Sequence, residues 1–294
     1  MSDFEDKVVI VTGAGNGLGR SHALAFAERG AKVVVNDLGG SVHGEGASDA
    51  ADAVVEEIKS AGGAAVANKA SVSDRDGAKS IVDDALAAFG TVDIVVNNAG
   101  ILRDKSFKNM TLDEFDLVID VHLRGSAYVT KFAWPIMYDK NWGRVVFTSS
   151  TSGIFGNFGQ ANYGAAKMAM LGLMNVLAIE GMTHNVRVNC LAPGAATRMT
   201  ASVPGSTLDM SNPPPQMSPA LVTPAVLYMC SEDAPSAQTI HAAGGRYSRS
   251  QTFTNQGVSL GLEANYEDLT EEVEKVVDMS SASPFDPLAR RRRR

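Results

Sequence analysis

The sequence predicts a single α/β domain, built on a doubly wound parallel sheet with helices on both faces and followed by a C-terminal extension. Short apolar runs rich in Val and Ile alternate along the chain with longer segments of helical periodicity. The apolar runs are continuous rather than alternating, which is typical of strands buried on both faces of a sheet. Strands of this kind separated by helices indicate parallel pairing with helical crossovers.

Six strands are expected in the first 194 residues, over 7–13, 32–37, 64–71, 92–100, 143–150 and 186–194. Helices are expected between them, over 17–30, 46–62, 76–90, 111–137 and 163–181. Thr111 and Glu114 form a T-x-x-E capping box, so the fourth of these helices should begin near residue 112.

The fourth helix carries His122 on an otherwise apolar face, which it shares with Phe115, Ile119, Ser126 and Val129 at steps of three and four residues. An imidazole on such a face is either a hydrogen-bonded core residue or part of a site. The pattern alone leaves both interpretations open.

The regular pattern ends near residue 200. Residues 200–224 are rich in Pro, Ser and Met without periodicity, and we expect a substrate lid or a mobile loop there. The domain is placed at 1–240 and the extension at 241–294. The extension should hold one short strand near 246–253, an acidic amphipathic helix over 266–279 and a disordered end over 280–294 that includes the arginine run 290–294.

Composition excludes several classes of function. The formal charge of the 294-residue chain is −7, and it becomes −12 when the five terminal arginines are left out, which argues against nucleic-acid binding. Cys190 and Cys230 lie in apolar runs and show no disulfide or metal-ligand spacing, so they are expected to be core thiols in a reducing compartment. No signal peptide and no membrane-spanning stretch is expected, which favours a cytoplasmic protein without membrane contact.

A glycine-rich turn joins the first strand to the first helix, with Gly13, Gly17 and Gly19 in the spacing T-G-x-x-x-G-x-G. Such glycines let the backbone approach a pyrophosphate at the helix N-terminus, although a tight turn without a ligand looks the same. Asp37 ends the second strand, 18 residues after Gly19. A carboxylate there accepts hydrogen bonds from ribose hydroxyls and repels a 2′-phosphate, so NAD is favoured over NADP.

Tyr163 and Lys167 lie four residues apart on one helix face. Free tyrosine has a pKa of about 10, and a nearby ammonium favours the phenolate, which brings the phenol closer to the range of acid–base catalysis. Ser150 ends the fifth strand and can hydrogen-bond a substrate oxygen. A lone Y-x-x-x-K usually decorates a helix surface, but together with the glycine turn, Asp37 and Ser150 it is more specific.

Over residues 5–235 the chain resembles the short-chain dehydrogenase/reductases, through TGAGNGLG (12–19), NNAG (97–100), Ser150 with YGAAK (163–167), and NCLAPG (189–194). The resemblance implies a Rossmann-like fold in which Tyr163 donates and accepts the proton. Lys167 would lower the pKa of Tyr163 and hold the nicotinamide ribose, Ser150 would polarise the substrate oxygen, and Asn97 would brace the sheet. The implied NAD contacts are Gly13, Gly15, Asn16, Gly17, Leu18, Gly19, Asp37, Ser71, Val72, Asn98, Ala99, Gly100, Tyr163, Lys167, Pro193, Gly194, Ala196 and Thr197.

Four stretches, VVVNDLGG, NAGILRDKSF, VHLRGSAYVT and TSSTSGIFGNFGQANYGAAK, resemble more closely the (3R)-hydroxyacyl-CoA dehydrogenase unit of peroxisomal multifunctional enzyme type 2 and its stand-alone bacterial relatives. Three positions depart from the wider family. The loop PGAATRM is one residue shorter than P-G-x-x-x-T, which leaves the carboxamide contact of Thr197 open. Ser71 stands where an Asp often contacts adenine, so that contact would pass to the backbone of Ser71 or Val72. His122 replaces an asparagine, and we predict that it supports Lys167 or the proton path.

These observations lead us to expect an NAD-dependent oxidoreductase that interconverts a (3R)-3-hydroxyacyl-CoA thioester and its ketone. Phe155, Phe158 and the 200–224 segment would line the acyl site, unless they are ordinary surface residues. A hydroxysteroid or other bulky-alcohol dehydrogenase is the alternative within the enzyme class, and a catalytically silent NAD-binding scaffold is the alternative outside it. A homodimer or homotetramer is expected, through the helices at 112–138 and 163–180.

Overall fold

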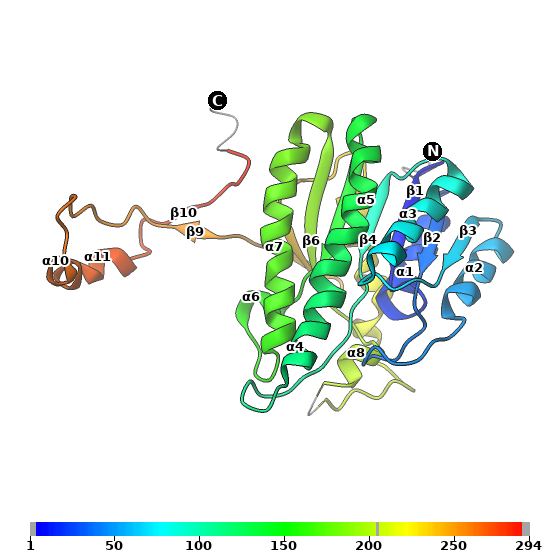
Figure 1. The fold of residues 1–294 in the computed structure, drawn as a ribbon, viewed down its shortest axis with the longest axis horizontal. Helices are drawn as coiled ribbons and strands as arrows, with labels where there is room; N and C mark the ends of the chain where they lie inside the picture. The colour runs from blue at the N-terminus through cyan, green and yellow to red at the C-terminus, as the bar shows by residue number, and fades with distance from the viewer. Residues whose placement is uncertain (1–3, 204–205, 290–294) are drawn as a thin grey trace. The chain divides into compact units, whose positions relative to one another are not determined.

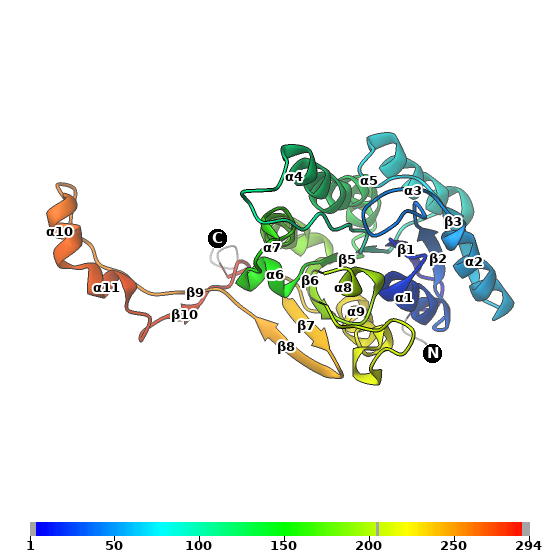
Figure 2. The same cartoon turned by 90° about the horizontal axis from the view of Figure 1, so that it is seen from below.

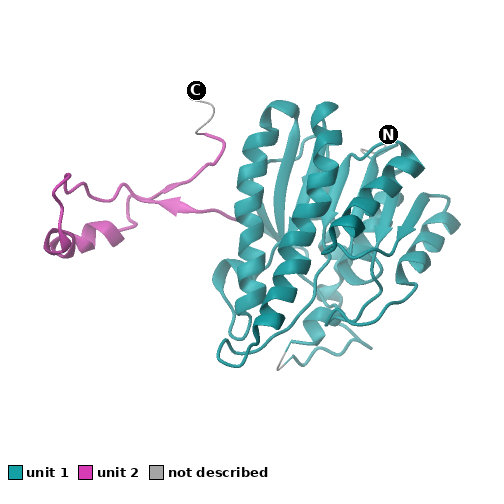
Figure 3. Cartoon of the chain, viewed as in Figure 1, with its two compact units in different colours: residues 1–249 teal, residues 250–294 magenta. Residues whose placement is uncertain are grey.

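The chain forms two compact units, residues 1–249 and residues 250–294 (Figure 3). The structure is a computed structural model, and it describes residues 4–203 and 206–289. Residues 204–205 of the expected lid and the arginine run 290–294 therefore lie outside the described residues. The division between the units falls nine residues after the domain boundary that composition suggested at 240.

Unit 1 contains an eight-stranded sheet in the order β3-β2-β1-β4-β5-β6-β7-β8 (Figures 1 and 2). All pairings from β3 through to β7 are parallel, and the predicted α/β fold class with a parallel sheet is confirmed. Each of the six expected strands is present. The strands are β1 (Val8–Thr12), β2 (Lys32–Asn36), β3 (Ala64–Asn68), β4 (Ile94–Asn97), β5 (Gly143–Thr148), β6 (Val186–Gly194), β7 (Thr239–Ala243) and β8 (Arg246–Ser250).

Strand β7 was not expected from the sequence, because TIHAA has no continuous apolar run and only part of it is buried. It pairs with β6 in parallel, from Cys190 opposite Thr239 to Gly194 opposite Ala243. The turn into β8 consists of Gly244 and Gly245, both with positive φ (57° and 77°), which is the backbone that a two-residue hairpin requires. β8 corresponds to the one short strand that was expected in the extension.

Helices cover both faces of the sheet (Figure 2). One face carries α1 (Gly17–Ala27), α2 (Ala50–Ser60) and α9 (Thr223–Cys230). The other carries α3 (Arg75–Phe89), α5 (Gly125–Asp139) and α7 (Ala161–Gly181). This unit also has three shorter helices. α4 (Leu112–Ile119) precedes α5, α6 (Thr151–Phe155) follows β5, and α8 (Arg198–Ala201) follows β6.

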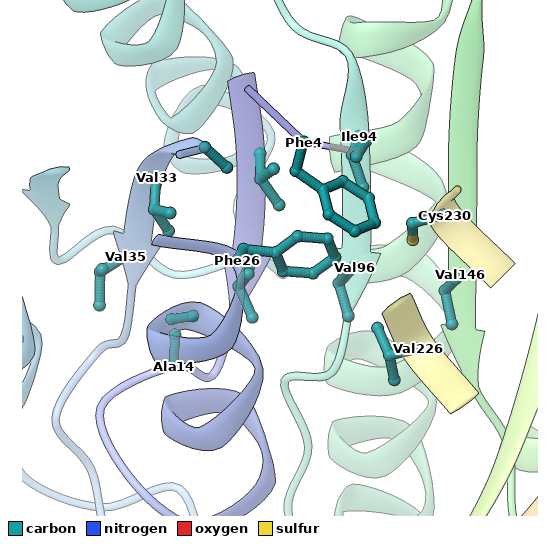
Figure 4. Close-up of a cluster of buried hydrophobic side chains, with 14 of the residues drawn as sticks. Phe4, Ala14, Phe26, Val33, Val35, Ile94, Val96, Val146, Val226 and Cys230 are labelled. Carbon is teal, nitrogen blue, oxygen red and sulfur yellow. The ribbon is translucent and has the colours of Figure 1, made fainter. Parts of the chain in front are cut away.

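The main core lies between the sheet and the α1, α2 and α9 layer (Figure 4). Strand residues such as Val33 and Val96 pack there against Phe26 of α1 and Val226 of α9. The Phe26 ring meets Phe4 edge to face, with ring centroids 5.0 Å apart. Cys190 and Cys230 are buried free thiols, as expected.

The helix predicted to begin near residue 112 does so, with both hydrogen bonds of the Thr111–Glu114 capping box formed. It is not one regular helix, however. A π-helical turn over Asp120–Arg124 separates α4 from α5 and contains His122. Wide turns of this kind are rare and concentrate at functional sites, and sequence periodicity does not reveal them because they shift the register by a single residue.

The 200–224 segment has more structure than the pattern indicated. It contains the end of α8, two single 3₁₀ turns at Pro215–Met217 and Pro219–Leu221, and the start of α9. The Ala196 N–H donates to the Met217 carbonyl, which ties the 3₁₀ turns back to the end of β6.

Unit 2 differs from its prediction in two ways. The expected single helix over 266–279 is two short helices, α10 (Tyr266–Glu271) and α11 (Val273–Val277), separated at Glu272. The expected disordered end contains β10 (Ser283–Pro284), which pairs antiparallel with β9 (Phe253–Thr254).

The segment Ala161–His184, which is α7 with the turn after it, is long and apolar enough to span a membrane by length and composition alone. The sequence prediction that no stretch reaches that length is therefore wrong. In the fold, α7 packs on β5, β6 and α4, and it buries Tyr163 and Lys167. Packing against the sheet buries only part of its apolar surface, since Met168 and Val176 stay exposed.

Candidate active site

The glycine turn after β1 leaves no room for side chains. Gly13 and Gly17 have φ of +63° and +53°, in the left-handed region that favours glycine. A Cβ on Gly19 would lie 2.1 Å from the Gly13 carbonyl oxygen, and one on Gly13 would lie 2.8 Å from the Ala99 Cα. The first helical N–H groups of α1 face this turn, and the Asn16 side chain makes no cap bond to them. Bare backbone at a helix N-terminus fits a pyrophosphate.

Asp37 lies directly beside this turn. Its carboxylate accepts hydrogen bonds from the Gly15 N–H and the Gly39 N–H, both at 2.7 Å. A Cβ on Gly15 would lie 2.9 Å from the Asp37 carboxyl carbon. The residue predicted to bind the ribose hydroxyls is thus at the correct end of β2, and it also fixes the position of the glycine turn.

The end of β4 is fastened to the same turn through Asn98. The Asn98 side-chain amide donates to the carbonyls of Thr12 and Gly13, each at 3.0 Å. The Thr12 hydroxyl accepts hydrogen bonds from the backbone N–H groups of Asn98 and Ala99. Asn97, by contrast, donates to the Thr130 hydroxyl and braces β4 against α5. β1 and β4 are therefore held together at the point where the strand order reverses, which is where open α/β sheets bind ligands.

Three predicted catalytic residues converge at the adjoining strand end. Ser150 follows β5 and is the N-cap of α6, its hydroxyl accepting from the Ser152 N–H at 3.2 Å. Tyr163 and Lys167 project from the first turns of α7 and are 9% and 4% exposed. The Lys167 Nζ lies 5.4 Å from the centroid of the Tyr163 ring and donates to the Thr148 carbonyl at 2.6 Å.

The electrostatics of this group correct one expectation. Burial is the main influence on Tyr163 and raises its pKa to about 12, because the phenolate would lose its solvation. A hydrogen bond with Ser150 lowers this pKa, and the charge of Asp104 raises it. The pKa of Lys167 is itself lowered to about 7, mainly by burial. The expected lowering of the Tyr163 pKa by Lys167 is therefore not found, and burial sets the direction of the shift.

His122 lies next to these residues and is 1% exposed. Its ring packs edge-on against Tyr163, with centroids 5.3 Å apart. The Nε2 atom is 3.0 Å from the Ile101 N–H nitrogen and 2.8 Å from the Ile101 carbonyl oxygen, so it accepts from one or donates to the other according to its tautomer. Burial, followed by the charge of Lys167, holds the pKa of His122 well below its ordinary value. His122 is therefore a neutral imidazole.

The Nδ1 atom of His122 is buried and has no hydrogen-bond partner among the described residues. A Cβ on Gly100 would lie 2.3 Å from the His122 ring, so Gly100 leaves the space that the imidazole fills. The histidine on the apolar helix face therefore lies against Tyr163, the candidate acid–base residue. A relay through Lys167 stays a prediction.

Pro193 and Gly194 are the last residues of β6 and pair with Ala242 and Ala243 of β7. Thr197 caps α8, and its methyl carbon lies 3.3 Å from where a Cβ on Gly17 would be. The shortened loop therefore brings Thr197 against the glycine turn. Ala196 is buried, and its N–H is already used by Met217.

The two residues proposed for the adenine side lie after β3. The Ser71 hydroxyl is 2.9 Å from that of Ser73, while Val72 is buried against α5, where a Cβ on Gly125 would lie 2.6 Å from it. Leu18 in the glycine turn packs on the main core, which leaves only its backbone for a cofactor. Contacts from Ser71, Val72 and Leu18 to a cofactor therefore stay predictions about backbone groups.

An apolar cluster surrounds Tyr163. Ile101, Leu102, Val118 and Ala166 are its buried members, and Met199 and Val203 from the 200–224 region pack against them. Phe155 and Phe158, which were expected to line an acyl site, are instead 72% and 91% exposed. Phe155 stacks on His241 of β7, with centroids 6.0 Å apart. The residues that pack around Tyr163, and His241 beside Phe155, come from distant parts of the chain, so no local sequence pattern could have identified these contacts.

Two further residues near the site were not predicted. Gln160 is buried and its side-chain amide donates to Asp104 at 2.7 Å. Asp104 lies in the stretch NAGILRDKSF, but a carboxylate between Arg103 and Lys105 looks like an ordinary surface residue in sequence. Only the charge that it exerts on Tyr163 marks it out.

Comparison with known proteins agrees with this geometry. Residues 7–206 match the short chain dehydrogenase family. Peroxisomal multifunctional enzyme type 2 of Drosophila melanogaster is 47% identical over 292 residues, which cover 97% of this chain and 48% of that enzyme. Peroxisomal multifunctional enzyme A of Dictyostelium discoideum is 53% identical over 244 residues, covering 82% of this chain and 53% of that enzyme. The chain thus spans about half the length of these two relatives.

The crystal structure of a short chain dehydrogenase from Mycobacterium avium superposes with a TM-score of 0.80 at 38% identity. That comparison covers 95% of this chain and 97% of the other. The family match, the whole-chain similarity and the glycine, serine, tyrosine and lysine positions agree with one another. The chain belongs to the short chain dehydrogenase family.

Proposed function

We propose that this dehydrogenase uses NAD to interconvert a (3R)-3-hydroxyacyl-CoA and the corresponding 3-ketoacyl-CoA. Members of the family use NAD or NADP with a small-molecule substrate. The observation that carries the proposed chemistry is the meeting of Ser150, Tyr163 and Lys167 beside a glycine turn that only bare backbone can form. A complete set of acid–base and cofactor-binding groups favours an enzyme over a silent scaffold.

The preference for NAD rests on Asp37. Its carboxylate is fixed between Gly15 and Gly39, where it can turn toward ribose hydroxyls and where a 2′-phosphate would meet a negative charge. Replacing Asp37 with Ser should lower the ratio of kcat/KM for NAD over NADP. Asp37→Asn is the matched control, since it keeps an acceptor for the Gly15 N–H while removing the charge. An unchanged ratio in both variants would contradict the assignment.

The protein's own residues account for the movement of the proton. Tyr163 takes the hydroxyl proton when the alcohol is oxidised and returns it when the ketone is reduced. Ser150 donates a hydrogen bond to the substrate oxygen, which stabilises negative charge as it develops there. A bound nicotinamide supplies the hydride acceptor or donor at the carbon atom. With a pKa of about 12, Tyr163 is held near pH 7 as the neutral phenol, the form that donates the proton in ketone reduction, and its phenolate is the form that accepts the proton in alcohol oxidation.

The choice of substrate rests on two supports. The similarity to peroxisomal multifunctional enzymes covers most of this chain. The apolar cluster of Ile101, Leu102, Met199 and Val203 around Tyr163 offers an environment that suits an acyl chain.

The test is a panel of (3R)- and (3S)-hydroxyacyl-CoA esters of several chain lengths, followed through NADH absorbance and repeated with NADP. We expect turnover of the (3R) series with NAD and loss of it in Tyr163→Phe, which removes only the hydroxyl. Tyr228→Phe, at a half-exposed tyrosine of α9, is the control. Turnover of hydroxysteroids but of neither acyl-CoA series would replace the substrate assignment. NAD binding without turnover of any alcohol would return the chain to the scaffold class.

Two further properties remain part of the proposal. A homodimer or homotetramer would form through α4, α5 and α7, where Leu112, Leu117, Met168 and Val176 are exposed apolar residues. Light scattering coupled to size exclusion measures this directly, and a monomer at micromolar concentration would contradict it. We also propose a cytoplasmic location, which fractionation of the cells that express the protein would test.

A further inference from the structure

Asp104 is held against the turn that leads into Tyr163. Its Oδ2 atom accepts a hydrogen bond from the side chain of Gln160, the N-cap of α7. The neighbouring Arg103 carbonyl accepts from the Asn162 side chain at 3.0 Å, and the Lys105 N–H donates to the Gly159 carbonyl at 2.9 Å. The segment 103–105 is therefore bonded, residue by residue, to the segment that positions the tyrosine.

Among the residues that the structure describes, no lysine or arginine neutralises the charge of Asp104. Arg103 pairs with Glu45 at 2.9 Å, and Lys105 pairs with Glu114 at 2.6 Å, so the two cations that flank Asp104 in sequence are engaged elsewhere. Across residues 4–203 and 206–289, no Lys or Arg lies within ion-pair distance of Asp104. Its Oδ1 atom is sealed from solvent and receives no hydrogen bond.

A half-buried carboxylate with one sealed oxygen and no ion pair is destabilising in itself, because the charge has lost water and gained only one neutral hydrogen-bond donor. Burial raises the pKa of Asp104, opposed by the Gln160 hydrogen bond and by His43 of the loop after β2. Groups in this condition concentrate at functional sites. A purely structural contact to Gln160 could be made equally well by a neutral side chain.

The group that this charge reaches is the candidate acid–base phenol. Lys167 on its own helix, His122 on the π-helical turn and Ser150 before α6 lie against Tyr163, and the charge of Asp104 acts on it from the segment after β4. Cys190 of β6 faces Lys167, and His43 faces Asp104. Among these, a carboxylate is the one group whose charge favours the neutral phenol over the phenolate.

We propose that Asp104 is a positioning residue for proton transfer, whose negative charge, held by Gln160 beside α7 and paired with no lysine or arginine of the described residues, adds to burial in keeping Tyr163 in its protonated form. The inference rests on the proposed function, since it requires Tyr163 to be the acid and base. Its consequence is that oxidation of the alcohol begins at a higher pH, and reduction of the ketone persists to a higher pH, than burial of Tyr163 alone would set.

The decisive variant is Asp104→Asn, which keeps an acceptor for Gln160 and removes the charge. For alcohol oxidation, the acid limb of the kcat/KM profile should move down by about 0.5 to 1 pH unit, the smaller end of charge effects because the carboxylate is only half-buried. On that limb kcat/KM should then rise about 3- to 10-fold. Asp104→Glu restores the charge and should restore the profile of the parent protein.

Asp116→Asn is the matched control. Asp116 is an exposed carboxylate of α4, also after β4, and removing its charge leaves the ion pairs of Arg103 and Lys105 in place. We expect no movement of the limb in this variant. A role of Asp104 limited to anchoring α7 would lower thermal stability or the plateau value of kcat/KM without moving the limb.

Asp104→Ser provides a second neutral variant if Asp104→Asn folds poorly by circular dichroism. An unchanged or upward-shifted limb in the folded neutral variants would overturn the proposal, as would an Asp104→Glu protein that behaves like Asp104→Asn. If neither neutral variant folds, Asp104 is a structural anchor and the proposal is equally overturned.

A readout without substrate separates this proposal from the proposed function. Near-ultraviolet tyrosinate absorbance is compared at one alkaline pH between each protein and its Tyr163→Phe counterpart, which isolates one phenol among the six tyrosines. The phenolate fraction assigned to Tyr163 should be about 3- to 10-fold larger in Asp104→Asn. A parent that turns over no alcohol but shows this difference would refute the function and leave the role of Asp104 standing. Equal fractions would refute the role.

Discussion

Replacing Gly19 with Ala tests the claim that the turn after β1 is a cradle of bare backbone. The added Cβ would lie 2.1 Å from the Gly13 carbonyl oxygen and 2.6 Å from the Asn98 side-chain nitrogen. Real Cβ atoms essentially never approach closer than 3.0 Å, so the turn must open by 0.9 Å at the carbonyl (3.0 minus 2.1). The displaced atom is backbone, and the Asn98 bond to Gly13 that fastens β4 to the turn must break with it. We expect a loss of about 2–3 kcal/mol in the free energy of unfolding.

The assay is thermal unfolding with and without NAD. For a chain of this size a loss of 2–3 kcal/mol corresponds to a fall in Tm of roughly 4–10 °C. NAD at 100 times its Kd should stabilise the parent by about 2.7 kcal/mol, and Gly19→Ala should lose that gain because the pyrophosphate contacts are displaced. Isothermal calorimetry with NAD measures the same loss without heating.

Gly172→Ala is the matched control. Gly172 lies within α7, and a Cβ there meets no atom within 4 Å. Alanine in a helix interior is favoured over glycine, so this variant should gain about 0.5–1 kcal/mol and bind NAD as the parent does. A Gly19→Ala protein with the Tm and NAD affinity of the parent would refute the assignment of the turn.

Three further outcomes are expected. Arg144→Met should lower the free energy of unfolding, measured by urea denaturation, by about 3 kcal/mol or more. The fully buried guanidinium donates to four backbone carbonyls, which methionine would leave without a donor. A loss below about 1 kcal/mol would contradict this expectation. Burial lowers the pKa of His22 from 6.5 to about 3, so as the pH falls the unfolded state binds a proton on His22 before the folded state does. The contribution of neutral His22 to the free energy of unfolding is therefore full above pH 6.5 and is lost as the pH falls toward 3. Between pH 6.5 and about 5 this amounts to about 2 kcal/mol, so His22→Gln should show a flatter acid dependence in urea titrations, and equal slopes would argue against it. His122→Ala should lower kcat about 10-fold, the size of one neutral hydrogen bond, with little change in NAD affinity, and unchanged turnover would return His122 to a packing role.

Sequence patterns predicted the regular elements well wherever the local rule and the tertiary demand coincide. The six predicted strands have apolar runs, and β6 begins and ends at the predicted residues. Thr111 caps α4 as expected, because a capping box is satisfied within four residues of chain. β7 escaped prediction because its pairing with β6, rather than its own side chains, makes it a strand.

The same division holds in the site. Gly13, Gly17 and Gly19 were identifiable because their lack of side chains is written in the sequence, and Tyr163 and Lys167 because four residues of helix place them on one face. The pKa of Tyr163 was predicted with the wrong direction. A pKa depends on burial, and burial comes from residues as distant as Ile101 and Met199.

The sequence by itself determined the fold class, the family and the order of the catalytic and cofactor-binding groups, because each is encoded in short-range spacing. The tertiary structure decided what those groups do to one another. It placed His122 on a π-helical turn against the Tyr163 ring. It paired Arg103 and Lys105 with other carboxylates, so that Asp104 has no ion pair with either. It also brought Thr197 against the glycine turn. Electrostatic and packing interactions act between atoms close in space, and closeness in space between distant segments is fixed only when the chain folds.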